Sequence, residues 1–207
     1  THLETDKAYT WLKSPRWRGQ PMEVGPLARL AVWLARGEPR MTELATQALT
    51  TLDLPTEAIY STMGRTAARA LETQLLVEKM QGWMDELMAN IAAGDLRVHD
   101  ASKWEPRTWP RSGAGVGVVE APRGALGHWM VVENGKIANY QAVVPTTWNA
   151  GPRDGQGGIG PYEASLMDNH ALADREMPLE IIRTIHSFDP CLACAVHVAG
   201  KDGEDGL

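Results

Sequence analysis

The chain has little cysteine, a single phenylalanine, no long apolar run and no cluster of basic residues. Two cysteines in 207 residues exclude a small disulfide-rich scaffold. The longest apolar stretches, such as residues 27–35, are interrupted by charge and fall short of the roughly 20 residues that cross a bilayer. The formal net charge of −6 and the lack of a basic run argue against a nucleic-acid partner.

What is present is the composition of a globular domain, with 43% apolar and 22% charged residues. A chain of 207 residues is long enough to bury a sizeable core, in one domain or two small ones. Eight tryptophans accompany four tyrosines and one phenylalanine. Because tryptophan is large and its N–H needs a partner when buried, this excess indicates a heavily packed or interface-rich protein.

Apolar spacing predicts helices over the first half of the chain. We expect one over residues 26–36, because Pro26 suits a first turn and Gly37 ends it, and another over 42–52. A longer helix is predicted within residues 56–93, which contain no proline. Its apolar residues recur every three or four positions and therefore share one face: Leu76, Met80, Trp83, Leu87 and Ile91.

The period then changes to that of extended structure. Segments 116–118, 128–133 and 136–144 are expected to be strands. Asn134-Gly135 separates the last two, and both residues tolerate positive φ, which is typical of a two-residue hairpin turn.

Two loops and a short helix complete the prediction. Residues 97–112 carry turn signals, and the glycine-rich loop 151–160 lacks the residue order of a phosphate-binding motif. A helix is expected from 178 to about 187. The sequence therefore predicts a mainly α fold with a small antiparallel β element.

The stretch 189–197, DPCLACAVH, is the most informative about chemistry. Cys191, Cys194 and His197 recur every three residues, so a turn or helix after Pro190 would project all three towards one side. Thiolates select soft or borderline metals such as nickel, iron, zinc or copper(I). Two thiolates do not fill a four-coordinate site, so further ligands have to come from elsewhere.

The spacing of the cysteines leaves other interpretations open. A thioredoxin-like redox pair needs a βαβ context upstream, which this sequence lacks. The pair is also compatible with half of a zinc site completed by another chain, or with two buried cysteines that have no chemical role. A structural disulfide is a poor interpretation, because so small a ring removes little entropy from the unfolded chain.

The same stretch is similar to the carboxy-terminal nickel-binding motif of NiFe hydrogenase large subunits. Further segments resemble this family in the same order: PMEVGPLAR (21–29), GRTAARALE (64–72), EAPRGALGHW (120–129), NYQAVVPTTWNAGPRD (139–154), YEASL (162–166) and RTIHSFDPC (183–191). The similarity covers residues 9–198 and is greatest to the membrane-bound respiratory uptake group. It implies part of the large-subunit fold.

The resemblance implies metal ligands and catalytic residues. Cys191 corresponds to a terminal thiolate on nickel, and Cys194 to a thiolate that bridges nickel and iron. Arg123 corresponds to the arginine whose guanidinium overhangs the metals, and it is implicated in hydrogen activation together with Asp189. Because the charge of an arginine is permanent, a structural ion pair is the alternative role for Arg123.

Four further positions take roles from the resemblance. Pro122 corresponds to a residue that lines the pocket of the diatomic ligands, and Thr146 to a hydroxyl that hydrogen-bonds a cyanide on iron. His197 resembles a ligand of structural magnesium, and Ala142 the residue that offers its backbone carbonyl to the same ion. The implied cofactors are a nickel–iron centre with carbonyl and cyanide ligands, and magnesium.

The implied reaction is the reversible oxidation of dihydrogen to two protons and two electrons. Electrons leave through iron–sulfur clusters on a separate small subunit, and a membrane cytochrome b is a further partner through the complex. The implied location is the periplasmic side of the membrane, reached as a heterodimer that the signal of the small subunit exports. The precursor is cytoplasmic.

Two features depart from the family. Its members carry a second CxxC pair near the amino terminus, together with the glutamate of proton transfer and an acidic magnesium ligand, whereas this chain has no other cysteine. We therefore expect residues 1–197 to be the carboxy-terminal part of the large-subunit domain, which needs the remaining amino-terminal part to build the centre. A fragment of a longer subunit is the favoured interpretation, and a separate polypeptide that supplies the other half is the alternative. The second departure is that residues 198–207 are still attached. They correspond to an extension that a maturation endopeptidase removes after nickel insertion, and their polar second half differs from the usual hydrophobic tail of the family.

Other classes of protein fit less well. The hydrogenase-derived subunit of the respiratory NADH–quinone oxidoreductase shares the fold but lacks the cysteines, so Cys191 and Cys194 argue against it. A catalytically inert fragment that docks to an iron–sulfur partner stays open for the chain by itself. A generic zinc-binding module does not explain the collinear matches.

Overall fold

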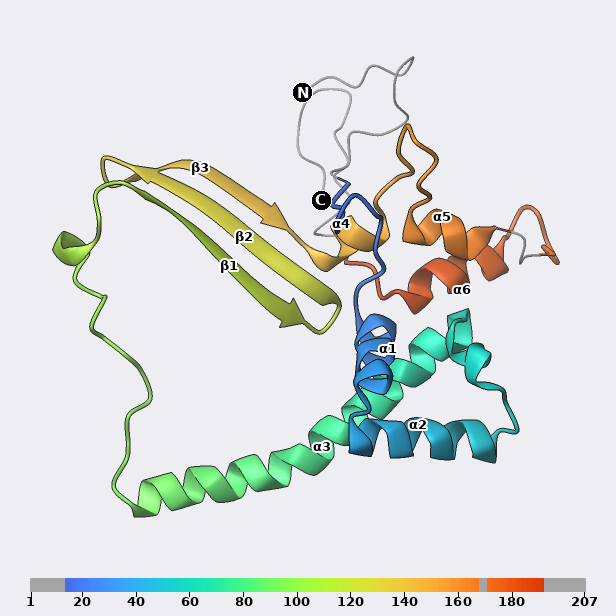
Figure 1. Cartoon of the computed structure of the whole chain (residues 1–207), viewed down its shortest axis with the longest axis horizontal. Coiled ribbons are helices and arrows are strands. Elements are labelled where there is room, and N and C mark those ends of the chain that lie inside the picture. Colours follow the sequence, from blue (N-terminus) through green and yellow to red (C-terminus); the bar gives the residue numbers. More distant parts are fainter. Residues whose placement is uncertain (1–13, 168–170, 192–207) are drawn as a thin grey trace.

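The computed structural model describes residues 14–167 and 171–191. Most of this structure is helical, and a three-stranded antiparallel sheet extends beside the helices (Figure 1). The arrangement confirms the predicted fold class, mainly α with a small antiparallel β element. Among the described residues, no helix combines the length and the apolar character that a membrane span requires.

The first two helices, α1 (Pro26–Arg36) and α2 (Pro39–Thr51), both begin at a proline. Helix α1 has the predicted bounds and ends at Gly37, which is left-handed with φ 67°. Helix α2 begins earlier than expected. The reason is that the Glu38 carboxylate accepts a hydrogen bond from the Met41 N–H at 2.6 Å and caps the new first turn.

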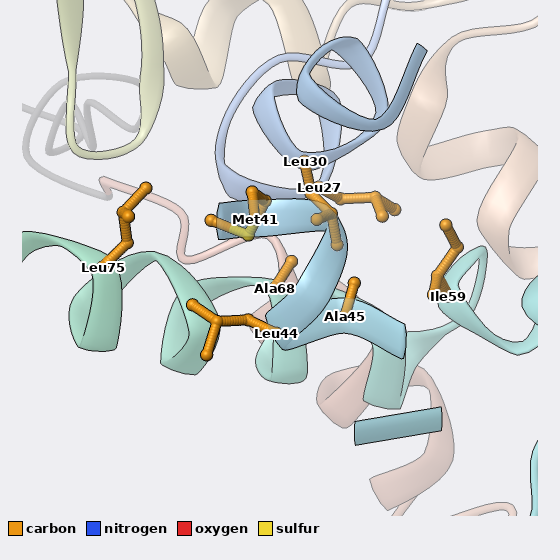
Figure 2. Packing of buried hydrophobic residues seen from close by; sticks show 8 residues of the cluster. All are labelled: Leu27, Leu30, Met41, Leu44, Ala45, Ile59, Ala68 and Leu75. Carbon is orange, nitrogen blue, oxygen red and sulfur yellow. The ribbon is translucent and has the colours of Figure 1, made fainter. Parts of the chain in front are cut away.

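The apolar core lies where α1 and α2 meet the first half of α3 (Thr62–Ala92) (Figure 2). Met41 is fully buried and Leu30 is 1% exposed. The other members come from the same helices and from the 3-10 turn η1 (Thr56–Ile59): Leu27, Leu44, Ala45, Ile59, Ala68 and Leu75. This cluster anchors the first half of α3 against the other two helices.

The long helix begins later than the predicted range 56–93. Its first residues form η1 instead, and α3 starts after Ser61, whose hydroxyl accepts a hydrogen bond from the Gly64 N–H at 3.0 Å. A Cβ at Gly64 would lie 1.9 Å from the carbonyl oxygen of Ile59, so this close approach requires glycine. From there the helix runs unbroken through Gly82.

The second half of α3 projects away from the core (Figure 1). Among the described residues, no side chain of this helix after Leu75 is buried. The predicted apolar face is therefore exposed, by 44% to 59%, at Leu76, Met80, Trp83, Leu87 and Ile91. The spacing of these residues indicates a buried face, and nothing in the described part of the chain covers it.

Strands β1 (Gly113–Ala121), β2 (Gly124–Glu133) and β3 (Lys136–Val143) pair in chain order. The predicted hairpin turn joins β2 to β3, with φ 53° at Asn134 and 76° at Gly135. Strand β1 is exposed along nearly its whole length. Only the end of the sheet that holds the β1–β2 turn lies close to α1, whereas the other end reaches away (Figure 1).

Three short helices follow the sheet: α4 (Pro145–Asn149), α5 (Pro161–Leu166) and α6 (Leu179–Ser187). Helix α6 confirms the helix predicted at 178–187. The sequence did not predict α4 or α5, because helices of five and six residues are too short to show apolar periodicity.

The glycine-rich loop between α4 and α5 is held in shape by one of its own side chains. The Asp154 carboxylate accepts hydrogen bonds from the N–H groups of Gly158 at 2.8 Å and Gln156 at 2.9 Å. These bonds hold the pKa of Asp154 below its ordinary value. Because the loop's own carboxylate occupies these N–H groups, they are not free to bind a phosphate.

Candidate metal centre

The turn between β1 and β2 presents two predicted site residues, Pro122 and Arg123. Ala121 pairs with Gly124 in the strand register, which leaves a two-residue turn. Gly124 has φ 131°, and a Cβ there would lie 2.7 Å from the backbone nitrogen of Gly25. Glycine therefore allows the turn to approach the start of α1 closely.

Arg123 reaches from this turn to Asp189. Its Nε donates a hydrogen bond to the Asp189 backbone carbonyl at 2.9 Å and lies 3.1 Å from the carboxylate Oδ2, while Nη2 donates to Oδ1 at 3.3 Å. The side chains are 43% and 42% exposed. The structure thus brings two predicted site residues into contact and leaves both charges accessible.

The backbone of Asp189 explains how this carboxylate comes to face the turn. Its N–H donates to the carbonyl of His186 at 2.9 Å, and its φ of 55° is left-handed, so it ends α6. Aspartate tolerates this conformation better than most residues, and Pro190 prevents further helix. The chain therefore leaves α6 at Asp189 and passes through Pro190 to Cys191.

Cys191 is half-buried beside α4. Its backbone N–H donates to Oγ1 of Thr146 at 3.0 Å, and Thr146 is 4% exposed. A hydroxyl accepts through its lone pairs and donates through its own proton, so this bond does not use the Thr146 proton. The geometry is compatible with the predicted role of Thr146 as a donor to a ligand near Cys191.

Two arginines of α3 hold the chain directly before the site. The guanidinium carbon of Arg65 lies 3.8 Å from the ring centroid of Phe188, and its nitrogens form two 2.8 Å hydrogen bonds with Glu23. Arg69 Nη2 donates to the carbonyl of Ser187 at 3.1 Å. Because α3 is anchored in the core, these contacts fix the end of α6.

Tyr162 packs against the same segment from α5. Its ring centroid lies 4.8 Å from that of Phe188, and its hydroxyl is buried with no hydrogen-bond partner in the described part of the chain. Burial, and then the negative charge of Asp189, raise the pKa of Tyr162 to about 12. The phenol is therefore protonated at neutral pH.

Several residues that support the site had no predicted role. Asn149 is 2% exposed, and its side-chain amide exchanges two hydrogen bonds with the Val24 backbone, at 2.9 and 3.0 Å. Arg29 and Glu72 form an ion pair beside the Pro122 turn. All lie within segments that resemble the family. Their roles were not predicted, because two buried polar residues that are far apart in the sequence show no recognisable spacing.

Other predicted residues are not placed at the site. Cys194, His197 and the extension 198–207 lie outside the described residues. Ala142 is half-buried in β3 opposite His128, so its predicted partnership with His197 stays a prediction. Within residues 14–167 and 171–191, no group of three or more His, Cys, Asp or Glu side chains is placed to hold a metal ion.

The described residues nevertheless fit one side of a nickel–iron centre. As a thiolate, Cys191 would be a soft donor, and the buried Thr146 hydroxyl beside its backbone has a proton to offer. Arg123 contacts Asp189, which lies two residues before Cys191 in the sequence, and supplies a permanent positive charge. The sequence contains two cysteines, so this chain by itself would offer such a centre at most two thiolates.

Comparison with known proteins places nearly the whole chain in one family. Residues 1–197 match the nickel-dependent hydrogenase family. The chain is 52% identical to the uptake hydrogenase large subunit of Bradyrhizobium diazoefficiens and to the hydrogenase-1 large chain of Escherichia coli, covering 98% of this chain and 34% of each relative. The reduced Ni-Fe-Se hydrogenase of Desulfovibrio vulgaris Hildenborough matches with a TM-score of 0.72 and 37% identity, over 92% of this chain and 38% of that one.

These matches place the chain in a class of oxidoreductase subunits that depend on nickel. The chain belongs to the family of nickel-dependent hydrogenase large subunits. It spans about a third of the length of the relatives it matches.

Proposed function

We propose that the chain forms the carboxy-terminal portion of a NiFe hydrogenase large subunit that oxidises dihydrogen reversibly to protons and electrons. The observation that carries this proposal is a pair of contacts two residues apart in the chain, Arg123 with Asp189 and Thr146 with the backbone of Cys191. It joins three segments that each resemble the family motif. Membership of the nickel-dependent family supports the same reading.

In this proposal most of the metal ligands come from the end of the chain. Cys191 and Cys194 would hold the nickel–iron centre, and His197, together with the Ala142 carbonyl from β3, would hold magnesium. When bound, the nickel–iron centre would supply the heterolytic cleavage of dihydrogen. The second CxxC pair, from the remaining amino-terminal part, would supply the other thiolates.

The surrounding residues would bind the diatomic ligands and orient the Arg123 guanidinium. Thr146 would donate its hydroxyl proton to a cyanide ligand, and Pro122 would line the pocket of the diatomic ligands. Arg123 would supply a permanent positive charge to the site, and Asp189 orients its guanidinium through its carboxylate and its carbonyl. A fixed charge of this kind needs no reorganisation when a charge develops nearby.

The partners follow from the same proposal. An iron–sulfur small subunit takes the electrons, and a membrane cytochrome b receives them at the periplasmic side of the membrane. A maturation endopeptidase removes residues 198–207 from a cytoplasmic precursor once nickel is in place.

Metal content and infrared spectra of the complete subunit test the proposal. We expect nickel and iron in the purified heterodimer, and carbonyl and cyanide stretching bands in its infrared spectrum. Residues 1–207 purified alone are expected to oxidise no hydrogen, because they supply half of the thiolates. A native heterodimer without nickel or without those bands contradicts the proposal, as does hydrogen oxidation by residues 1–207 alone.

The exposed apolar face on the second half of α3 supports a proposal for where the rest of the subunit packs. Five large apolar side chains follow one another at helical spacing there, and none is buried by described residues. Relatives are about three times as long as this chain. An exposed contiguous apolar face normally marks an interface, so we assign it to the remaining amino-terminal part of the large subunit.

Leu87→Glu in the complete subunit tests this assignment. Burying an unpaired charge and losing apolar contact is expected to lower the free energy of unfolding by at least about 2 kcal/mol, measured by urea denaturation. Ala89→Glu is the matched control, because it adds the same residue on the opposite face of the exposed helix. Equal stability of the two variants, or loss of small-subunit binding without loss of stability, contradicts the assignment.

A further inference from the structure

Arg29 of α1 grips the turn that presents Pro122 and Arg123. Its Nη1 donates to the carbonyl of Ala121 at 3.1 Å, and its Nη2 donates to the carbonyl of Pro122 at 2.8 Å. These two carbonyls mark the start of the two-residue turn between β1 and β2. The contacts span more than 90 positions of sequence and tie the sheet to the helices.

Two carboxylates hold the Arg29 guanidinium in place. Glu72 of α3 accepts from Nε at 2.6 Å and from Nη2 at 2.7 Å, and Glu120 of β1 accepts from Nη1 at 2.8 Å. Together with the two carbonyls, these bonds use all five N–H donors that an arginine possesses. The guanidinium therefore cannot rotate without losing a hydrogen bond.

The environment keeps this guanidinium charged and largely enclosed. Arg29 and Glu72 are 15% and 16% exposed, whereas Glu120 is 54% exposed. Burial acts to lower the pKa of Arg29, but the hydrogen bonds that it donates to Glu72 and Glu120 outweigh burial and hold the pKa above its ordinary value. Because α3 is anchored in the core, Glu72 transmits the position of the helices to Arg29.

The other side of the turn is fixed by close backbone packing. A Cβ at Gly25 would lie 2.7 Å from the carbonyl oxygen of Arg123, and a Cβ at Gly124 would lie 2.6 Å from a methyl of Val24. The turn therefore packs on the two residues directly before α1 and is held by Arg29 from the first turn of that helix. A shift of Arg29 moves the backbone from which the Arg123 side chain extends.

We propose that Arg29 is a positioning residue of the metal centre, which holds the Pro122–Arg123 turn so that the Arg123 guanidinium stays against Asp189. This inference rests on the proposed function, because Arg123 acts on the reaction only in a hydrogenase. Arg29 itself touches neither Asp189 nor Cys191 in the described structure, and it acts through the turn.

Arg29→Lys in the complete heterodimer tests the role. Lysine keeps the charge but has no planar guanidinium that donates five hydrogen bonds, so some of the bonds that hold the turn are lost. We expect nickel, iron and the carbonyl and cyanide bands to be retained, and hydrogen oxidation to fall about tenfold to a hundredfold, the scale of a misplaced catalytic group. Glu120→Gln, which weakens the grip from its exposed side, is expected to show a smaller fall.

A double-mutant cycle separates positioning from general stability. If Arg29 acts through Arg123, then adding Arg29→Lys to Arg123→Lys changes turnover by less than about twofold, because the guanidinium it positions is already absent. A merely structural role predicts losses that multiply. The control is Arg40→Lys, which breaks an equivalent fork with Glu78 and Glu43 that contacts no turn carbonyl, and which is expected to leave activity unchanged.

The outcomes distinguish this inference from the proposed function. A wild-type heterodimer without nickel or without the infrared bands removes the proposed function. A wild type with both, combined with multiplicative losses in the cycle or with unchanged activity in Arg29→Lys, overturns the positioning role alone. Loss of nickel from Arg29→Lys in step with its activity also overturns it, because Arg29 then serves assembly of the centre.

Discussion

Cys191→Ser in the complete subunit is expected to lose nickel and all hydrogen oxidation. A serine hydroxyl is a hard, largely protonated donor at neutral pH, whereas nickel prefers the soft thiolate. The substitution keeps the bond from the residue 191 backbone N–H to Thr146 Oγ1, because that bond does not involve the side chain. The measurement is nickel per subunit by elemental analysis, together with hydrogen uptake by the purified heterodimer.

Ser187→Ala provides the matched control for this loss. It removes one buried side-chain oxygen four positions earlier in the same segment, and with it the 2.6 Å hydrogen bond to the Thr184 carbonyl. We expect nickel content and turnover to stay near the wild-type values, at a cost of about 1 kcal/mol in the free energy of unfolding. Full nickel content in Cys191→Ser, or an equal loss of nickel in Ser187→Ala, refutes the ligand role.

Local signals in the sequence predicted much of the fold. Helix α1 has the expected bounds because Pro26 and Gly37 mark its two ends, and Asn134-Gly135 specified the β2–β3 hairpin. The errors arise where a tertiary contact decides. The start of α3 depends on the close approach of Gly64 to Ile59, which no propensity encodes.

The apolar face of α3 shows what local periodicity cannot predict, namely the partner that covers a helix face. Its periodicity correctly identifies one helix face, but periodicity does not tell which partner covers that face. Leu75 packs in the core, whereas Leu76 and the later residues of the series are exposed in the described structure. The exposed tryptophans Trp83, Trp104 and Trp109 fit the interface-rich alternative that the composition raised.

The candidate site was predictable only in part, for a physical reason. Cysteine spacing indicates metal binding, but the pairing of Arg123 with Asp189 depends on the left-handed backbone that ends α6 and on a turn seated against α1. Resemblance to a family brought both residues forward without giving their geometry. The supporting contacts of Arg29 and Asn149 join segments more than 90 residues apart, and the structure is needed to find them.

Arg123→Lys is expected to lower hydrogen oxidation by about a hundredfold to a thousandfold while nickel, iron and the infrared bands are retained, the scale of losing one preorganised charged donor. Arginine uses Nε and Nη2 together on the carbonyl and the carboxylate of Asp189, at 2.9 and 3.3 Å. A lysine ammonium is a point charge on a flexible stem and does not reproduce this planar grip. The measurement is turnover per nickel, compared with the wild type under the same acceptor.

Arg97→Lys is the control for this charge-preserving change. Arg97 makes the same kind of two-nitrogen contact with a single aspartate, Asp95, at 2.8 and 2.7 Å, but it is 85% exposed and lies after α3, outside the site. Turnover of that variant is expected to match the wild type. If Arg123→Lys behaves in the same way, Arg123 and Asp189 form a structural ion pair without a part in hydrogen activation. Reduced turnover per nickel in Arg123→Lys alone places the guanidinium in the reaction, because the number of assembled centres is then unchanged.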